Sequence, residues 1–346
     1  LSGLTNSVGD TSVSTGTLHL TQNGMFNAAG LNIDSGATLQ LDANAQTTAS
    51  GSAVIDGTLD VTLGGTAPLL TAADATLNAS SSVLNISGYT SGPVAKASDL
   101  DGARTVVIHT TDGITGDFGS VVGVGAGSAD YIINDAKKST DGLDYSIGSS
   151  LAWNAVAPLS SGTFTLTDAN TFDVDVVLAD QAANGTLWDG KSLTKAGTGT
   201  LTLSAVNTYT GATHLTGGTL QTGIANALAD SSALALSSGT TFDLNDFDQQ
   251  VQNIGGSGDI TLGSATLTMQ NNSDFGMNGV ISGTGGLVKE GTGTLTLAGV
   301  NTYSGGTVIN AGRLSIFNEG ALGASSGGVT INNNAAFDIG VPGEFD

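Results

Sequence analysis

The sequence predicts an all-β solenoid, in which short parallel strands stack turn upon turn around one apolar core. The first observation is a pair of apolar residues separated by one residue, which recurs about every 20–25 residues. The pairs are Leu18-x-Leu20, Leu39-x-Leu41, Leu59-x-Val61 and Leu84-x-Ile86. The second observation is that Gly, Asn, Asp or Ser flanks each pair, while no amphipathic helix period is sustained.

Each pair predicts a strand of three to five residues whose alternate side chains face the core. A turn of about 20 residues cannot bury its own apolar face, so neighbouring turns must stack on it. We therefore expect residues 1–346 to form a single β-helix domain, although the length alone would favour two domains.

A longer repeat lies in the second half of the chain. The segment from Lys195 to Gly211, KAGTGTLTLSAVNTYTG, returns from Lys289 to Gly305 as KEGTGTLTLAGVNTYSG, at an offset of 94 residues. Two repeat units, each of about four turns, are therefore predicted over residues 191–340.

The rhythm of short strands lapses over residues 93–150. The segments 104–109 (RTVVIH) and 131–133 (YII) indicate longer strands, and half of the basic residues lie in this stretch. A β-hairpin insertion is predicted over 93–150, and wider turns of the same solenoid are the alternative.

The acidic composition limits the kinds of molecule that this protein can bind. Asp and Glu outnumber Lys and Arg 30 to 8, which gives a formal net charge of −22. So few cations cannot neutralise a phosphate backbone, so nucleic acid is excluded as a partner and anionic membranes are disfavoured. An acidic surface favours basic protein patches or divalent cations, and a merely solvating surface is the simpler alternative. The absence of Cys excludes disulfides, Cys-ligated zinc and thiol nucleophiles.

The two long repeats resemble the passenger-associated strand repeat of type V secreted autotransporters, of the diffuse-adherence and self-associating adhesin type. The segments 217–220 (GGTL) and 311–314 (AGRL) share this resemblance, which covers residues 180–340. It implies a right-handed, single-stranded parallel β-helix, covalently continuous with an outer-membrane β-barrel outside this sequence. It also implies display on, or release from, a Gram-negative cell surface.

No catalytic residue, cofactor or metal site is predicted. Protease passengers of the resembled class share the motif GDSGS, but residues 116–120 read GDFGS, with Phe118 in place of the nucleophile. Asp243, Asp246 and Asp248 form the densest acidic group, and paired carboxylates are what glycoside hydrolysis requires. No Lys or Arg lies nearby in sequence to hold an acidic sugar. The three His residues show no metal-ligand spacing.

Hydrogen-bonding side chains that recur on the strands are the candidate binding residues. If they point outward, stacked turns present a flat polar face that binds through many weak hydrogen bonds. If they point inward, they form ladders that stabilise the fold. In the long repeats the candidates are Thr202, Asn207, Thr296 and Asn301. Further candidates are Asp243, Asn245, Asp246 and Asp248 in the acidic segment, and Arg104 and Asp117 in the predicted insertion.

These observations favour a cell-surface adhesin that mediates cell-cell aggregation and biofilm formation, or attachment to a host-matrix protein or glycan. Two alternatives come from other classes of protein. One is a structural stalk without a ligand, and the other is a β-helix enzyme that acts on polysaccharides.

Overall fold

The computed structural model describes residues 5–63, 68–88, 94–100, 104–123, 125–126, 129–155, 159–168, 170–183, 188–228, 231–332 and 334–340. Pro93, the predicted start of the insertion, lies outside these residues. Within the described part, the chain is all-β apart from two 3-10 helices, η1 (Ala97–Asp99) and η2 (Ala152–Asn154). Neither helix, nor any other helix among these residues, has the length and hydrophobicity of a membrane span.

The chain divides into two compact units. The first comprises Leu1–Pro93, Leu100–Ser128 and Ile132–Ser150, and the second comprises Val94–Asp99, Ala129–Tyr131 and Leu151–Asp346. Each unit is a stack of parallel β-coils, which confirms the predicted all-β solenoid.

Two sheets form the described part of the first unit. The 11-stranded sheet runs in the spatial order β1 (Thr5–Ser7), β4 (Met25–Ala28), β7 (Gln46–Ala49), β10 (Leu70–Leu77), β12 (Thr105–Gly116), β16 (Asp144–Leu151), β15 (Ile132–Lys138) and β14 (Gly125–Ala126), with β2 (Thr11–Val13), β5 (Leu31–Ile33) and β8 (Ala53–Ile55) off this path. The five-stranded sheet runs β13 (Ser120–Val122), β11 (Val83–Ser87), β9 (Thr58–Thr62), β6 (Ala37–Leu41) and β3 (Gly16–Leu20).

The predicted apolar pairs stack directly on one another in the five-stranded sheet. Leu18 pairs with Leu39, Leu39 with Leu59, and Leu59 with Leu84, all in parallel register. Leu39, Leu59 and Leu84 are fully buried. The step of about 20 residues is therefore the length of one coil, because it returns the same side chain to the same core column.

The lapse in rhythm corresponds to a change from parallel to antiparallel pairing. β12 pairs antiparallel with β16, and β14 pairs antiparallel with β15. β15 and β16 are neighbours in the sheet, and the Ser139 N–H donates to the Asp144 carbonyl (2.8 Å) across the connection between them. A β-hairpin thus lies within the 93–150 stretch and continues the 11-stranded sheet.

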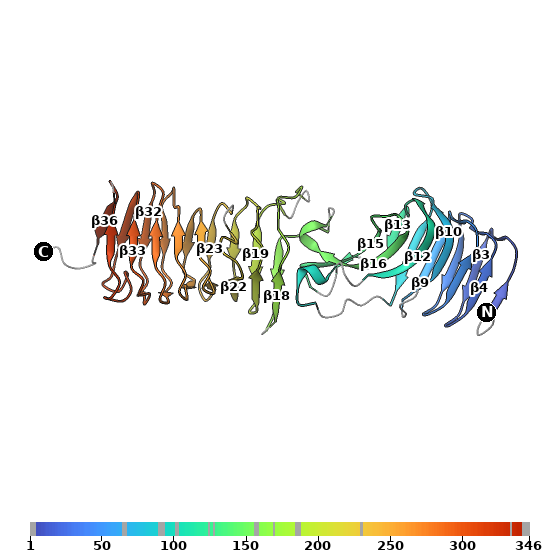
Figure 1. Ribbon diagram of the computed structural model, residues 1–346, viewed down its shortest axis with the longest axis horizontal. Coiled ribbons are helices and arrows are strands. Elements are labelled where there is room, and N and C mark those ends of the chain that lie inside the picture. The colour runs from blue at the N-terminus through green and yellow to red at the C-terminus, as the bar shows by residue number, and fades with distance from the viewer. Residues whose placement is uncertain are drawn as a thin grey trace. The chain divides into compact units, whose positions relative to one another are not determined.

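Three sheets form the described part of the second unit, and Figure 1 shows their coils stacked from β19 to β36. The nine-stranded sheet runs β17 (Thr163–Thr165), β19 (Leu193–Ala196), β21 (Thr213–Leu215), β23 (Leu234–Leu236), β26 (Ile254–Gly256), β29 (Phe275–Met277), β32 (Thr294–Leu297), β34 (Arg313–Ile316) and β36 (Ala336–Ile339). The six-stranded sheet runs β18 (Thr171–Val174), β20 (Thr200–Leu203), β22 (Thr219–Thr222), β24 (Thr241–Asp243), β27 (Asp259–Thr261) and β30 (Ile281–Ser282). The five-stranded sheet runs β25 (Gln249–Val251), β28 (Leu267–Met269), β31 (Leu287–Lys289), β33 (Thr307–Ile309) and β35 (Val329–Ile331).

The two long repeats do not occupy the same sheets. Successive coils of the nine-stranded sheet stack one column in the order Lys195, Leu215, Leu236, Gly256 and Met277. The second repeat begins at Lys289 rather than at Met277, so the offset between the repeats is not a whole number of coils. The second copy consequently begins part-way around the next coil. Its first strand, β31, lies in the five-stranded sheet, whereas the equivalent β19 lies in the nine-stranded sheet.

An aromatic cluster packs against the first coils of the second unit. The Trp153 side chain is fully buried, with its ring centroid 4.8 Å from that of Trp188 and 5.3 Å from that of Tyr209. The Trp153 indole N–H donates to the Ala179 carbonyl (2.8 Å). Trp153 and Trp188 are the 2 Trp residues of the chain and both belong to the second unit, so tryptophan fluorescence reports on the folding of that unit.

Core packing in the second unit can be tested at two Phe residues on the same coil. Phe242 is fully buried in the apolar column of the six-stranded sheet, whereas Phe247 is 38% exposed. Phe242→Ala should lower the free energy of unfolding by about 3–5 kcal/mol, because it leaves a cavity in the core. Phe247→Ala is the matched control and should change it by about 0.5 kcal/mol or less. Urea unfolding followed by tryptophan fluorescence measures both, and equal effects would contradict the assigned core.

Candidate functional site

The Lys that opens each long repeat is buried and holds backbone carbonyls. The Lys195 ammonium donates to the carbonyls of Ala196 (2.8 Å), Gly197 (3.0 Å) and Gly217 (2.9 Å), the last on the next coil. The side chain is fully buried, and desolvation lowers the pKa of Lys195 to about 8. Gly197 is required because its φ of 71° is left-handed and an added Cβ would lie 2.2 Å from the Leu166 carbonyl oxygen.

The second copy repeats this arrangement at Lys289. Its ammonium donates to the carbonyls of Glu290, Gly291 (2.8 Å) and Ala311 (3.4 Å). Burial lowers the pKa of Lys289 as well, against a smaller opposing effect of the Glu290 carboxylate. Sequence reasoning gave these lysines no role, although Lys195 follows Leu193 at the two-residue spacing of an inward-facing strand position.

The Asn of each repeat also points inward and connects three consecutive coils. Asn207 Oδ1 accepts the Leu178 N–H of the preceding coil (2.8 Å), and its Nδ2 donates to the Ala227 carbonyl of the following coil (3.1 Å). Asn301 makes the same two bonds, with the Ile281 N–H (2.7 Å) and the Ala321 carbonyl (2.6 Å). Both side chains are buried, so these two candidate binding residues serve the scaffold.

The Tyr that follows completes the buried motif. Tyr209 OH lies 2.7 Å from Thr213 Oγ1, and Tyr303 OH lies 2.5 Å from Thr307 Oγ1. Burial raises the pKa of both Tyr hydroxyls. The Lys, Asn and Tyr of the long repeat therefore all face the interior. The Lys and Asn satisfy backbone groups of neighbouring coils, and the Tyr hydroxyl contacts a Thr four residues later.

The outer face of the six-stranded sheet carries the candidates Thr202 and Asp243. Thr202 pairs in register with Gln221, and Gln221 with Asp243. The Thr202 hydroxyl donates to Gln221 Oε1 (3.4 Å), and Gln221 Nε2 donates to Asp243 Oδ2 (2.9 Å). All three side chains are half-buried. We call the register-aligned residues of this face the polar column, which consists of Asp173, Thr202, Gln221, Asp243, Thr261 and Ser282.

A second outward row lies beside the polar column. It consists of Thr171, Thr200, Thr219, Thr241 and Asp259, aligned on the same strands. The apolar residues between the two rows face inward, because side chains alternate along a strand. The six-stranded sheet therefore presents two parallel rows of hydroxyl, amide and carboxyl groups.

Thr296 lies on a different sheet from its repeat counterpart. It belongs to β32 of the nine-stranded sheet, where it stacks between Gly276 and Ser315. The structure therefore brings Thr202 and Asp243 together and places Thr296 elsewhere. The cause is that the repeat offset is not a whole number of coils, so the second copy starts at another position around the coil.

The acidic segment after β24 is a turn whose side chains hold backbone groups. Asn245 and Asp246 have left-handed φ values of 49° and 66°. Asp246 Oδ1 accepts the backbone N–H (2.7 Å) and the hydroxyl (3.0 Å) of Ser264 on the next coil. Asp248 Oδ1 accepts the Thr266 N–H (2.7 Å), and Asn245 Nδ2 donates to the Thr222 carbonyl (3.3 Å). Within the described residues, no group of three His, Cys, Asp or Glu converges to hold a metal ion.

The two candidates in the first unit fix its antiparallel part. Arg104 forms an ion pair with Asp135 (2.6 Å), and its Nε donates to the Ser146 hydroxyl (3.0 Å). Asp117 Oδ1 accepts the Tyr145 hydroxyl (2.7 Å). Burial raises the pKa of Tyr145, and the hydrogen bond to Asp117 raises it further.

Comparison with known proteins matches both long repeats to a described family. The family model of the passenger-associated-transport-repeat matches residues 193–222 and 287–316, the two segments that contain the buried Lys, Asn and Tyr. The adhesin BmaC autotransporter of Brucella suis biovar 1 (strain 1330) is 40% identical over 131 residues. The chain is an autotransporter passenger. The match covers 36% of the passenger and 4% of the relative's length.

Alkaline titration tests the buried lysines of the passenger. A folded-state pKa below the ordinary value means that the unfolded chain binds more protons, so stability rises with pH between about pH 8 and about pH 10. Lys195→Met with Lys289→Met should abolish that rise in the free energy of unfolding. It should also lower stability at pH 7 by about 1–3 kcal/mol, because carbonyls lose their donors. The exposed Lys191→Met is the control and should keep the rise; an unchanged profile in the double variant would contradict the assignment.

Acid titration tests the carboxylates that hold neighbouring coils. Hydrogen bonds from Ser264 lower the pKa of Asp246, and those from Thr294 lower the pKa of Asp274. Their stabilisation is present above the ordinary Asp pKa of about 3.9 and is lost as the pH falls through the lower folded value.

The urea midpoint should therefore decrease between about pH 4 and about pH 2. Asp246→Asn with Asp274→Asn should reduce this decrease, whereas the exposed Glu319→Gln should not. Identical pH profiles for the two variants would show that these hydrogen bonds do not contribute.

Proposed function

We propose that this passenger is a cell-surface adhesin that uses the polar column and the second outward row beside it as its contact face. The observation that carries the proposal is that the inward-facing and the outward-facing polar side chains have different roles. The buried Lys, Asn and Tyr hold the coils together, while the half-buried hydroxyl, amide and carboxyl groups face solvent in aligned rows. A flat row of this kind suits contact with another extended surface, through many weak bonds.

The relative that is named an adhesin supports the same class of function. On this proposal the passenger is displayed outside a Gram-negative cell, joined to an outer-membrane anchor, and it contacts neighbouring cells or a host-matrix protein or glycan. Each hydrogen bond would contribute about 1 kcal/mol net, so attachment depends on many displayed copies acting together.

The proposal includes no catalytic step. The carboxylates of the acidic turn, the strongest candidates for glycoside hydrolysis, accept hydrogen bonds from backbone groups of the next coil. That use fixes their orientation and lowers the pKa of Asp246. A general acid would need the opposite shift, towards a raised pKa.

Surface display with matched variants tests the contact face. The passenger is displayed on a non-adherent Gram-negative host, and settling of the culture and binding to immobilised matrix proteins are measured. Thr202→Arg places a bulky cation in the polar column and should reduce attachment several-fold. Thr296→Arg makes the same change at the equivalent repeat position on the nine-stranded sheet and should leave attachment unchanged. Equal attachment by all three strains, with equal display, would favour a stalk without a ligand.

Salt separates the two kinds of partner. Two copies that each carry a formal charge of −22 repel one another, so screening should speed cell-cell settling. A basic host protein is attracted to the same charge, so screening should weaken its binding. Raising NaCl from about 0.1 M to about 1 M shortens the Debye length from about 10 Å to about 3 Å and distinguishes these outcomes.

A further inference from the structure

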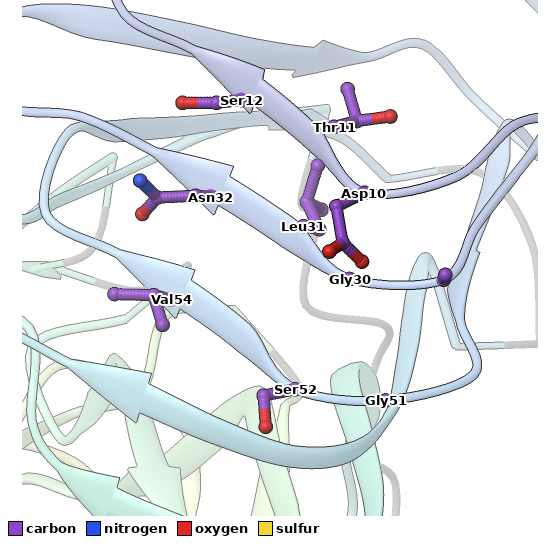
Figure 2. A pocket seen from close by; sticks show the side chains of 10 residues that line it. Asp10, Thr11, Ser12, Gly30, Leu31, Asn32, Gly51, Ser52 and Val54 are labelled. Carbon is purple, nitrogen blue, oxygen red and sulfur yellow. The ribbon is translucent and has the colours of Figure 1, made fainter.

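A hollow in the first unit is separate from the residues of the proposed contact face. It lies on the outer side of β2, β5 and β8, is open to solvent, and has a volume of about 480 Å³, within the range of small-ligand sites. Figure 2 shows Ser12, Asn32 and Val54 projecting to the same side of these three strands, one from each. They are aligned in register, so the hollow crosses three consecutive coils.

The hollow exists because glycine occupies the corner of the coil. Gly30 lies between Asp10 and Ser52 on the neighbouring coils, and in Figure 2 the Asp10 carboxylate lies over its bare backbone. A Cβ added at Gly30 would lie 3.0 Å from Asp10 Oδ1. One at Gly51 would lie 2.9 Å from the Ala29 carbonyl oxygen. The missing side chains leave the floor of the hollow open and lined by backbone.

Hydrogen-bonding groups around the hollow are available to a ligand. Among the described residues, neither the Asp10 carboxylate nor the Ser12 hydroxyl has a hydrogen-bond partner, and both residues are exposed. Asn32 Nδ2 donates to Asp34 Oδ1 (2.7 Å), which fixes the amide and leaves its Oδ1 as an acceptor. Ser52 is held similarly by Asp74 (2.8 Å). The lining therefore offers mainly acceptors, and of these the Asn32 amide oxygen is held in place by a hydrogen bond of its own side chain.

The charge and shape of the lining define the class of ligand. Its ionisable side chain is Asp10, and no Lys, Arg or His lines the hollow. An anionic ligand would be repelled, whereas a ligand that donates many hydrogen bonds would satisfy the acceptors. Half-buried Val54 offers an apolar contact for C–H groups, and no aromatic side chain is present to stack on a planar ring. Sugars carry hydroxyl donors alternating with C–H faces.

We propose that this hollow binds a saccharide chain without acid groups, with the chain crossing β2, β5 and β8. Asp10 and Asn32 accept hydrogen bonds from sugar hydroxyls, Ser12 donates or accepts, and Val54 contacts the C–H face of one ring. The hollow is shallow and the hydrogen bonds are few, so the affinity of one copy is low. Multiple displayed copies raise the effective affinity for a glycan-coated surface.

A glycan array probed with the labelled 346-residue chain tests the ligand class. We expect retention on neutral and amino-bearing glycans and none on uronate or sulfated glycans. Calorimetric titration with a retained oligosaccharide then gives the affinity. Retention limited to acidic glycans, or no retention at all, would overturn the proposal.

Variants assign the binding to the hollow. Asn32→Ala should weaken binding about tenfold, as expected for loss of one well-placed hydrogen bond. Gly30→Val fills the floor and should abolish binding; its φ is not left-handed, so the backbone accepts the change. Asn85→Ala removes an equivalent amide, which donates to Asp60 on the neighbouring coil (3.0 Å) outside the hollow, and should bind as the parent does. Circular dichroism confirms that each variant is folded. Parent-like binding by both hollow variants would overturn the proposal.

This outcome is independent of the proposed contact face. Cell settling measured on the Thr202→Arg strain reports on the polar column of the second unit, whereas glycan binding by the Asn32→Ala chain reports on the hollow in the first unit. If Thr202→Arg leaves settling unchanged, the proposed contact face fails. If Asn32→Ala leaves glycan binding unchanged, the proposed glycan site fails.

Discussion

Every coil in this protein depends on its neighbours for its hydrogen bonds. A coil of about 20 residues contains several short strands and the turns between them, and its backbone N–H and C=O groups point along the stack rather than within the coil. Thr213 and Leu234 show the consequence. Thr213 pairs in register with Leu193 and Leu234 on the two adjacent coils, and Leu234 pairs with Thr213 and Ile254. Where the turns leave backbone N–H and C=O groups unpaired, side chains from an adjacent coil form the hydrogen bonds instead.

The buried polar residues of the long repeat are explained by this constraint. Asn207 supplies one acceptor to the preceding coil and one donor to the following coil, which a pair of apolar residues cannot do. Lys195 satisfies three carbonyls at one point, at the cost of desolvating an ammonium group, and its lowered pKa records that cost. An unsatisfied carbonyl inside the stack would be costlier to tolerate than it would be at a surface turn.

The acidic composition has a related cause. Asp246, Asp248 and Asp274 each accept a backbone N–H from the next coil, at 2.7 Å in every case. A short side chain reaches the adjacent coil from a turn with little loss of rotamer freedom, which explains why 27 of the 30 acidic residues are Asp. The negative surface of the passenger is therefore partly a by-product of how its coils are joined, and any partner must accommodate it.

The sequence by itself determined the fold class, the coil length and the identity of the apolar columns, because Leu39, Leu59 and Leu84 alternate and recur at the spacing that a stacked coil requires. It also determined the passenger class, through two copies of a long motif. Only the tertiary structure decided which polar residues face inward. Thr202 faces outward because it alternates with the buried Leu201 and Leu203 on β20, whereas Asn207 lies in the turn after β20, where no alternation indicates which way a side chain points.

The structure alone also decided that Thr202 and Thr296 lie on different sheets, because that depends on the summed length of several successive coils, and no local pattern contains that sum. The hollow at Gly30 was likewise hidden from sequence. Glycine is common in turns, and Gly30 forms the floor of a hollow only because Asp10 and Ser52 are stacked on the coils on either side of it.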